Sequence, residues 1–111
     1  MRRDDLLAHA RQLLDGSVPL PAGTARVAAA MLIRRALEEL AAEWSGCPEA
    51  TTRSQLVIAA RRLPPTEAER ACLAWFALSE ACHHHAYRLP PNPVELVRWL
   101  SVVGGLPAPH P

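Results

Sequence analysis

The sequence predicts an all-α protein, a single-domain bundle of four to five helices. Three observations favour this fold class. Apolar residues recur at spacings of three and four, clusters of proline and glycine separate these stretches, and no two-residue alternation bounded by hairpin turns indicates a strand. With 111 residues and 50% hydrophobic content, the chain can bury one core without disulfides or metal. We therefore expect one helical domain over residues 1–103 and a disordered tail over residues 104–111.

The first predicted helix spans residues 3–14. Asp4 and Asp5 stand where acidic side chains stabilise a helix N-terminus, and the apolar residues that follow lie on one stripe. That stripe consists of Leu6, Leu7, Ala10, Leu13 and Leu14. Residues 15–23 are rich in proline and glycine and predict a loop, either a flexible hinge or an arm that contacts a partner.

The second predicted helix has Thr24 as its N-cap and extends to about residue 44. Opposite its apolar stripe, Arg34 with Glu38 and Arg35 with Glu39 have the i, i+4 spacing of ion pairs on a solvated surface. We expect the stripe to face the core; it consists of Val27, Ala30, Ile33, Leu37, Leu40 and Trp44.

The third predicted helix extends to Leu63, and Thr52 with Gln55 resembles a capping box at its start. Its expected inward residues are Leu56, Val57, Ala60 and Leu63. The fourth, residues 66–89, begins after two prolines with Thr66 and Glu69 as a second capping box. Because residues 71–78 are all apolar, we expect this helix to be covered on most sides and to be the central one.

The fifth predicted helix starts at Asn92 as N-cap, with Pro93 in the first helical position and Glu95 in the first turn. Two glycines at 104 and 105 end it. Its apolar side consists of Leu96, Trp99, Leu100 and Val103. The three tryptophans fall on three different predicted helices, as expected of core aromatics in a small bundle.

Composition and charge exclude several classes of function. Twelve basic and 11 acidic residues give a net charge of +1, so nothing draws the whole molecule to nucleic acid or anionic lipid. Three cysteines without a CxxC pair favour neither a disulfide framework nor a zinc knuckle. There is no signal-peptide pattern and no run of eighteen apolar residues. We expect a soluble cytoplasmic protein without a membrane segment.

The histidine cluster at residues 83–85 is the main candidate for chemistry. Neighbouring helical residues point about 100° apart, so at most two of these histidines share a site. Glu80 and His84 lie on one face and form half of a metal site, which only Cys47, His9 or a second subunit could complete. We therefore predict no metal or cofactor.

An acid–base site needs fewer residues. One histidine that titrates near neutrality and one cation suffice, and His85, Tyr87 and Arg88 crowd the same predicted helix end. The alternative is structural, because histidines also cap the last carbonyls of a helix and interact favourably with its dipole.

The segment LSEACHHHAYRL, residues 78–89, resembles the HEPN superfamily of small all-α domains. The superfamily signature is an arginine, four to six residues, and a histidine; in members partnered with minimal nucleotidyltransferases, a tyrosine often follows the histidine two positions later. His85 and Tyr87 match that ending, and residues 34–40, RRALEEL, look like the long second helix of the family. Glu80 stands at the four-spaced arginine position, and Ser79 and Leu78 at the longer spacings, so the motif arginine is absent.

The resemblance implies a metal-independent endoribonuclease that dimerises, in a toxin–antitoxin or phage-defence system, sometimes with a nucleotidyltransferase as partner. His85 would be the general acid or base, Tyr87 would orient the substrate or be modified by a partner, and Arg88 would contact RNA phosphate. Arg88, Arg34, Arg35 or an arginine across a dimer interface would replace the absent cation. The alternative is a non-catalytic helical binding or adaptor subunit of a larger assembly. Both interpretations predict a homodimer.

Overall fold

The computed structural model describes residues 2–83 and 90–109, and this part of the chain contains five α-helices and no strand. The helices are α1 (Arg3–Asp15), α2 (Ala22–Ser45), α3 (Thr52–Ala59), α4 (Pro65–Cys82) and α5 (Pro93–Gly104). The predicted all-α bundle is confirmed. Tyr87, Arg88, His84 and His85 lie outside the described residues, as does the predicted extension of the fourth helix to residue 89.

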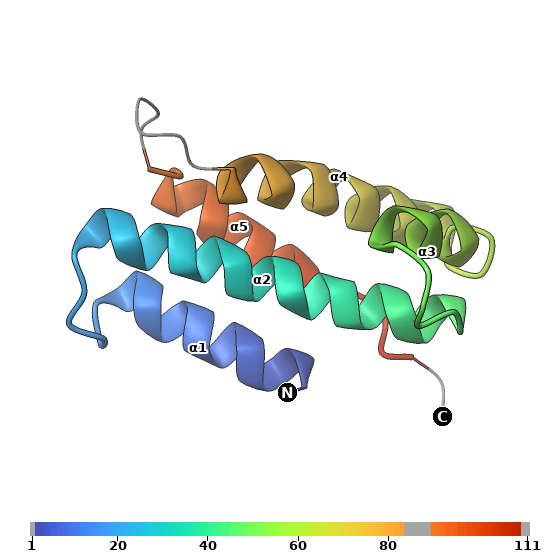
Figure 1. Ribbon diagram of the computed structural model, residues 1–111, viewed down its shortest axis with the longest axis horizontal. Coiled ribbons are helices and arrows are strands. Elements are labelled where there is room, and N and C mark those ends of the chain that lie inside the picture. The colour runs from blue at the N-terminus through green and yellow to red at the C-terminus, as the bar shows by residue number, and fades with distance from the viewer. Residues whose placement is uncertain (1, 84–89, 110–111) are drawn as a thin grey trace.

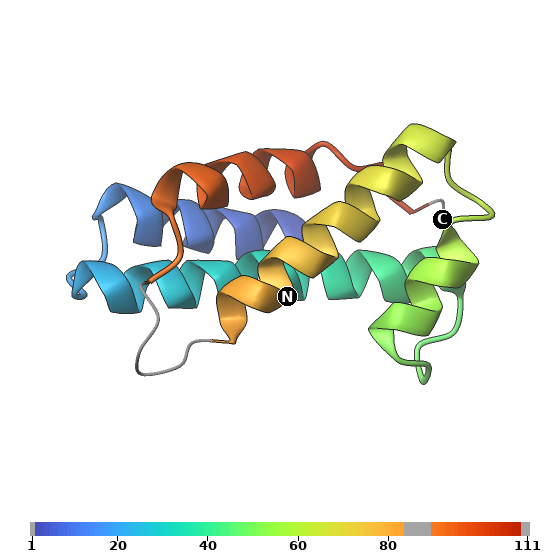
Figure 2. The same ribbon diagram turned by 90° about the horizontal axis from the view of Figure 1, so that it is seen from above.

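Helix α2 is the centre of the bundle, because it contacts each of the other four helices. Figure 1 shows α1 and α4 on opposite sides of it, and Figure 2 shows α4 crossing it obliquely. Ile33 and Leu37 of α2 are fully buried, together with Leu78 of α4 and Leu96 of α5. The prediction that residues 66–89 form the central, covered helix was wrong: Leu73 and Phe76 of α4 are 52% and 62% exposed.

Hydrogen bonds from backbone amides to capping side chains mark the N-termini of α3 and α5. The Asn92 side chain accepts a hydrogen bond from the amide of Val94 at 2.8 Å, which confirms the predicted cap of α5. The cap of α3 is Thr51 rather than Thr52, and it accepts from the amide of Ser54 at 3.2 Å. Gln55, the other half of that predicted capping box, is buried and donates to the carbonyl of Cys47 instead.

The N-cap positions of α2 and α4 lie three and two residues earlier than predicted, and neither helix has a side-chain cap. Pro21 and Pro64 occupy the capping positions, so Thr24 and Thr66 lie inside their helices. Proline has a fixed φ that suits the entry to a helix, and its missing N–H costs nothing there, which explains why the prolines outcompete the threonines.

Helix α3 ends at Ala59, four residues before the predicted end at Leu63. A tight turn follows, in which the amides of Arg62 and Leu63 both donate to the carbonyl of Ala59. The two prolines at 64 and 65 disfavour helical geometry in the preceding residue and shorten the helix. Val57 and Ala60, predicted to face inward, are therefore exposed.

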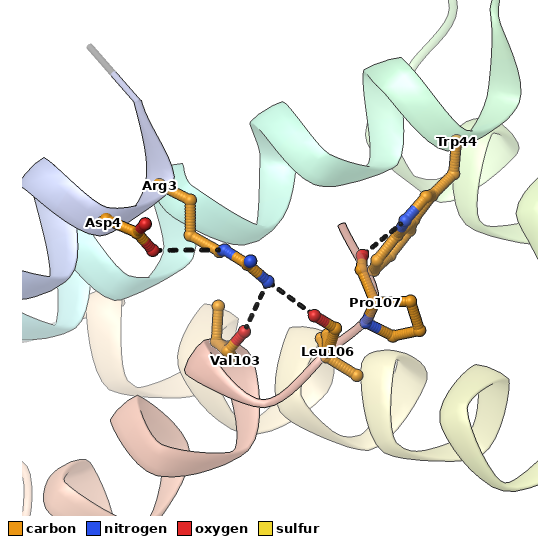
Figure 3. A network of polar contacts seen from close by, with 6 residues as sticks. All are labelled: Arg3, Asp4, Trp44, Val103, Leu106 and Pro107. Atoms are coloured by element: carbon orange, nitrogen blue, oxygen red, sulfur yellow. Dashed lines mark hydrogen bonds and ion pairs between the residues drawn. The ribbon is translucent and has the colours of Figure 1, made fainter. Parts of the chain in front are cut away.

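The predicted disordered tail over residues 104–111 was wrong for the part that the structure describes. Leu106 is 3% exposed and belongs to the core, and residues 106–109 lie across one end of the bundle. Trp44 and Arg3 hold this segment through its carbonyl groups (Figure 3). Residues 110–111 lie outside the described part.

Candidate functional site

The described part of the predicted site is the C-terminal end of α4. Glu80 lies in the last turn with an exposed side chain, Cys82 is the last helical residue, and the exposed His83 caps the helix. The amide of His83 donates to the carbonyls of Ser79 and Glu80, each at 3.2 Å.

Arg34 of α2 is positioned beside this end of α4. Its guanidinium carbon lies 4.7 Å from the centroid of the Trp75 ring, a cation–π contact. It also hydrogen-bonds the side chain of Cys82. Arg34 therefore faces α4, whereas the sequence predicted a solvated pair with Glu38; the second predicted pair, Arg35 with Glu39, is present at 3.5 Å.

The polar atoms around Arg34 are incompletely paired. Trp75, Ser79 and Cys82 occupy positions i, i+4 and i+7 of α4 and so lie on one face. Among the described residues, the buried Nε of Arg34 and the buried Oγ of Ser79 have no hydrogen-bond partner. Buried polar groups of this kind usually have a hydrogen-bond partner. At this junction of α2 and α4, one donor of Arg34 and the hydroxyl of Ser79 can therefore each form a further hydrogen bond.

The thiol of Cys82 is not an activated nucleophile. Burial raises its pKa above the ordinary value; the hydrogen bond and positive charge of Arg34 counteract this in part, and the negative charge of Glu38 raises the pKa further. A thiol with a raised pKa is protonated at neutral pH, and the thiolate is the reactive form. The role of Arg34 here is to bring a positive charge to the end of α4.

A second feature lies on another part of α4 and was not predicted. An apolar groove of about 280 Å³ runs between α3 and α4. One wall comes from α3 and the turn after it and the other from α4, with Arg53, Leu56, Val57, Ala60, Cys72, Trp75 and Phe76 as the lining. Val57 and Phe76 are 63% and 62% exposed. Exposed apolar side chains that gather around a groove are typical of an interaction surface.

Exposed residues of opposite charge lie on the two chain segments that form this groove, and among them only Arg53 belongs to its lining. On α4, Glu69, Leu73, Phe76 and Glu80 follow at spacings of four, three and four residues, and all four are exposed. On the α3 side, Arg53, Val57 and Ala60 are exposed at spacings of four and three residues, and the exposed Arg61 follows in the turn after α3. We call these the acidic stripe and the basic stripe. Each has apolar residues in the middle and charges of one sign at its ends.

The sequence contained the signal for this surface, but the uniform run of residues 71–78 concealed it. The residues of α4 that are buried in the bundle are Ala71, Ala74 and Leu78, and the two alanines let the neighbouring helices approach closely. The larger Leu73 and Phe76 occupy the outer face. The two faces of α4 differ in the size of their side chains and not in polarity, so a pattern based on polarity does not distinguish them.

In the described residues, the protein is therefore a bundle of five helices with two notable surface features. One is the apolar groove between α3 and α4, and the other is Arg34 beside the end of α4. Comparison of the chain with protein-family models, with curated proteins and with solved structures found no match. Within residues 2–83 and 90–109, no three His, Cys, Asp or Glu side chains gather where they could hold a metal ion. None of the helices described is both long enough and apolar enough to cross a bilayer.

Proposed function

We propose that this protein is a helical binding subunit that pairs with a second copy through the α3–α4 groove. The observation that supports this is the charge pattern: the acidic stripe of one copy matches the basic stripe of another. In a twofold arrangement, α3 of each copy lies on α4 of its partner, and both contacts join opposite charges. A surface with charges of one sign would repel its own copy.

The dimensions of the stripes agree with this pairing. At 1.5 Å per residue, the eleven helical steps from Glu69 to Glu80 span about 16 Å. The eight steps from Arg53 to Arg61 would span about 12 Å in a helix, and the last two of them lie in the turn after α3. Arginine and glutamate side chains bridge the difference. A cavity of about 150 Å³ holds a benzene ring, so the groove of about 280 Å³ has room for the exposed phenyl ring of Phe76 from a second copy.

Other exposed apolar residues have less support as an interface. Leu20 and Met31 lie near the start of α2, and Val94 and Val97 lie on α5. The hollow beside Met31, lined by residues 23, 24, 27, 28, 31 and 90, has no charged residue in its lining and gives no complementary pattern. The α3–α4 groove combines exposed apolar area with an arginine in its lining, and exposed glutamates lie on the neighbouring surface of α4.

Replacing Phe76 by aspartate should separate the dimer. The substitution removes the aromatic side chain that fills the groove and places a third carboxylate in the acidic stripe. Loss of such a central anchor costs at least about 2 kcal/mol of binding free energy, or roughly a 30-fold weaker dissociation constant. Sedimentation velocity over a concentration series measures this directly.

The matched control is Val94→Asp, which places the same charge at a 75% exposed apolar position of α5. Aspartate in the first turn of a helix is favourable, so the control should keep both the fold and the dimer. The proposed function would be contradicted if Phe76→Asp and Val94→Asp were both monomeric, or if the wild type did not dimerise.

A second candidate is the metal-independent endoribonuclease that the HEPN resemblance implies. The observation that favours it is Arg34, which contacts Trp75 and interacts with Cys82 at the end of α4; in the sequence, Cys82 directly precedes the histidine cluster. Arg34 would supply the positive charge that the motif lacks at Glu80, with His85 as general acid or base and Tyr87 and Arg88 at the substrate. Such a protein would act as a toxin or phage-defence component, alone or with a nucleotidyltransferase.

The nuclease candidate predicts cleavage of tRNA or total RNA in the presence of EDTA. His85→Ala should lower the rate about 10²–10⁴-fold, the usual contribution of a general acid or base. Arg11→Ala, a change at an exposed arginine of α1, should leave the rate nearly unchanged. Absence of cleavage by wild type and by Glu80→Arg would reject catalysis and leave the binding subunit.

A further inference from the structure

Among the described residues that line the α3–α4 groove, Arg53 alone is charged, and the others are apolar or cysteine. The side chain of Arg53 is exposed and forms no hydrogen bond or ion pair with the residues that the structure describes. Arg53 also lies in the first turn of α3, where the helix dipole adds positive potential. An occupant that complements this groove is therefore mostly apolar and carries one negative charge.

The walls of the groove suit an aromatic group in particular. Trp75 and Phe76 contribute two aromatic rings, and aromatic rings pack favourably against one another. The thiol of Cys72 adds a polarisable sulfur, a favourable neighbour for the edge of a ring. The groove of about 280 Å³ exceeds the cavity of about 150 Å³ that holds benzene, so a phenyl ring and a short chain fit within it.

The helical bundle itself fixes the shape of this groove. Leu56 is 5% exposed and belongs to the core cluster, so one residue of the lining is anchored in the interior. The guanidinium carbon of Arg34 lies 4.7 Å from the centroid of the Trp75 ring and holds the indole from the α2 side. A binding site whose walls are already in place loses little conformational freedom when a ligand binds.

We propose that the α3–α4 groove binds a small aromatic monocarboxylate, in which a short chain joins a single ring to the carboxylate. The ring packs against Trp75 and Phe76, and the carboxylate pairs with the guanidinium of Arg53. A phenyl ring flanked by carboxylates is also what the acidic stripe of a second copy presents. The ligand therefore competes with the second copy and releases the monomer. This competition rests on the proposed dimer, whereas binding of the ligand to the groove does not.

The binding test titrates phenylpropionate into the full-length protein, diluted until sedimentation velocity shows a monomer, with saturation-transfer NMR as the readout. We expect a dissociation constant on the order of 1 mM, which is ordinary for a ligand of about eleven non-hydrogen atoms. The uncharged phenylpropionamide has the same shape and should bind about fivefold more weakly, because it lacks the charge that pairs with Arg53. If the wild type stays dimeric on dilution, Glu69→Gln with Glu80→Gln neutralises the acidic stripe and leaves the lining intact.

Arg53→Gln removes the positive charge and keeps a side chain that suits a helix. The substitution should weaken binding of phenylpropionate about fivefold and leave binding of phenylpropionamide unchanged. Arg11→Gln, the same change at an exposed arginine of α1, should alter neither affinity. The proposal would be overturned if wild type bound the acid and the amide equally or bound neither, or if a folded Arg53→Gln variant kept the full affinity for the acid.

The competition test uses sedimentation velocity at a protein concentration where the wild type is dimeric. Saturating phenylpropionate should convert the dimer to monomer. Propionate at the same concentration supplies the charge and the ionic strength without the ring, and should leave the dimer intact. A dimer that persists although the acid binds would overturn the competition. A wild type that is monomeric at every concentration would contradict the proposed dimer alone, and the binding test would then decide this proposal by itself.

Discussion

Leu37→Ala should lower the free energy of unfolding by about 2–5 kcal/mol, the range for a buried leucine truncated to alanine. Leu37 is fully buried in α2, the helix that contacts the other four. Neighbouring helices therefore surround the cavity that the substitution would leave, and water cannot fill it from the surface. The measurement is urea unfolding followed by circular dichroism. Because a dimer makes stability depend on concentration, all variants must be compared at one protein concentration.

The control for this prediction is Met31→Ala on the same helix. Met31 is 58% exposed, and surface changes of this kind usually stay within about 0.5 kcal/mol. A loss equal to that of Leu37→Ala, or no loss in either variant, would contradict the assignment of α2 as the central helix.

The small residues of α2 explain why this helix, and not α4, is central. Ala29, Ala30, Ala36 and Ala41 are fully buried and leave room for neighbours on several sides. In the sequence, only Ala30 among these alanines falls in the predicted apolar stripe, whereas the continuous apolar run of α4 stands out. Hydrophobicity alone predicted the wrong centre, because close packing depends on side-chain size as well as polarity.

The helices themselves could be predicted well from local signals. The leucine spacing of α1 and the Asn92–Pro93 start of α5 led to the observed elements, since stripe and cap both act within a few residues. The errors fell at α2, α3 and α4, where a proline competed with a threonine for the cap or ended the helix early. The outcome of this competition depends on small differences in free energy between alternative helix boundaries, and the sequence pattern does not give those differences.

Contacts between distant residues could not be predicted. Nothing near Leu106 in the sequence indicates that Arg3 and Trp44 will hold the carbonyls of residues 106 and 107. The contact of Arg34 could not be predicted either. Its i, i+4 spacing to Glu38 favoured a surface ion pair, but the crossing of α2 and α4 places Arg34 against Trp75. Of the predicted site, Glu80 is described at the end of α4, and the roles of His84, His85, Tyr87 and Arg88 stay predictions.

Charge reversal should convert the proposed homodimer into an obligate heterodimer. One variant carries Arg53→Glu and Arg61→Glu, so both of its stripes are acidic; the other carries Glu69→Arg and Glu80→Arg, so both are basic. In either variant alone, each α3–α4 contact joins like charges, which costs several kcal/mol. In a mixture, every contact joins opposite charges again.

The most direct test of the proposed self-association is therefore the mass of these two proteins by sedimentation velocity, separately and mixed in equal amounts. We expect two monomers that form a one-to-one dimer on mixing, with the wild type dimeric throughout. Variants that remain dimeric alone, or stay monomeric when mixed while the wild type is a dimer, would show that the acidic and basic stripes do not meet.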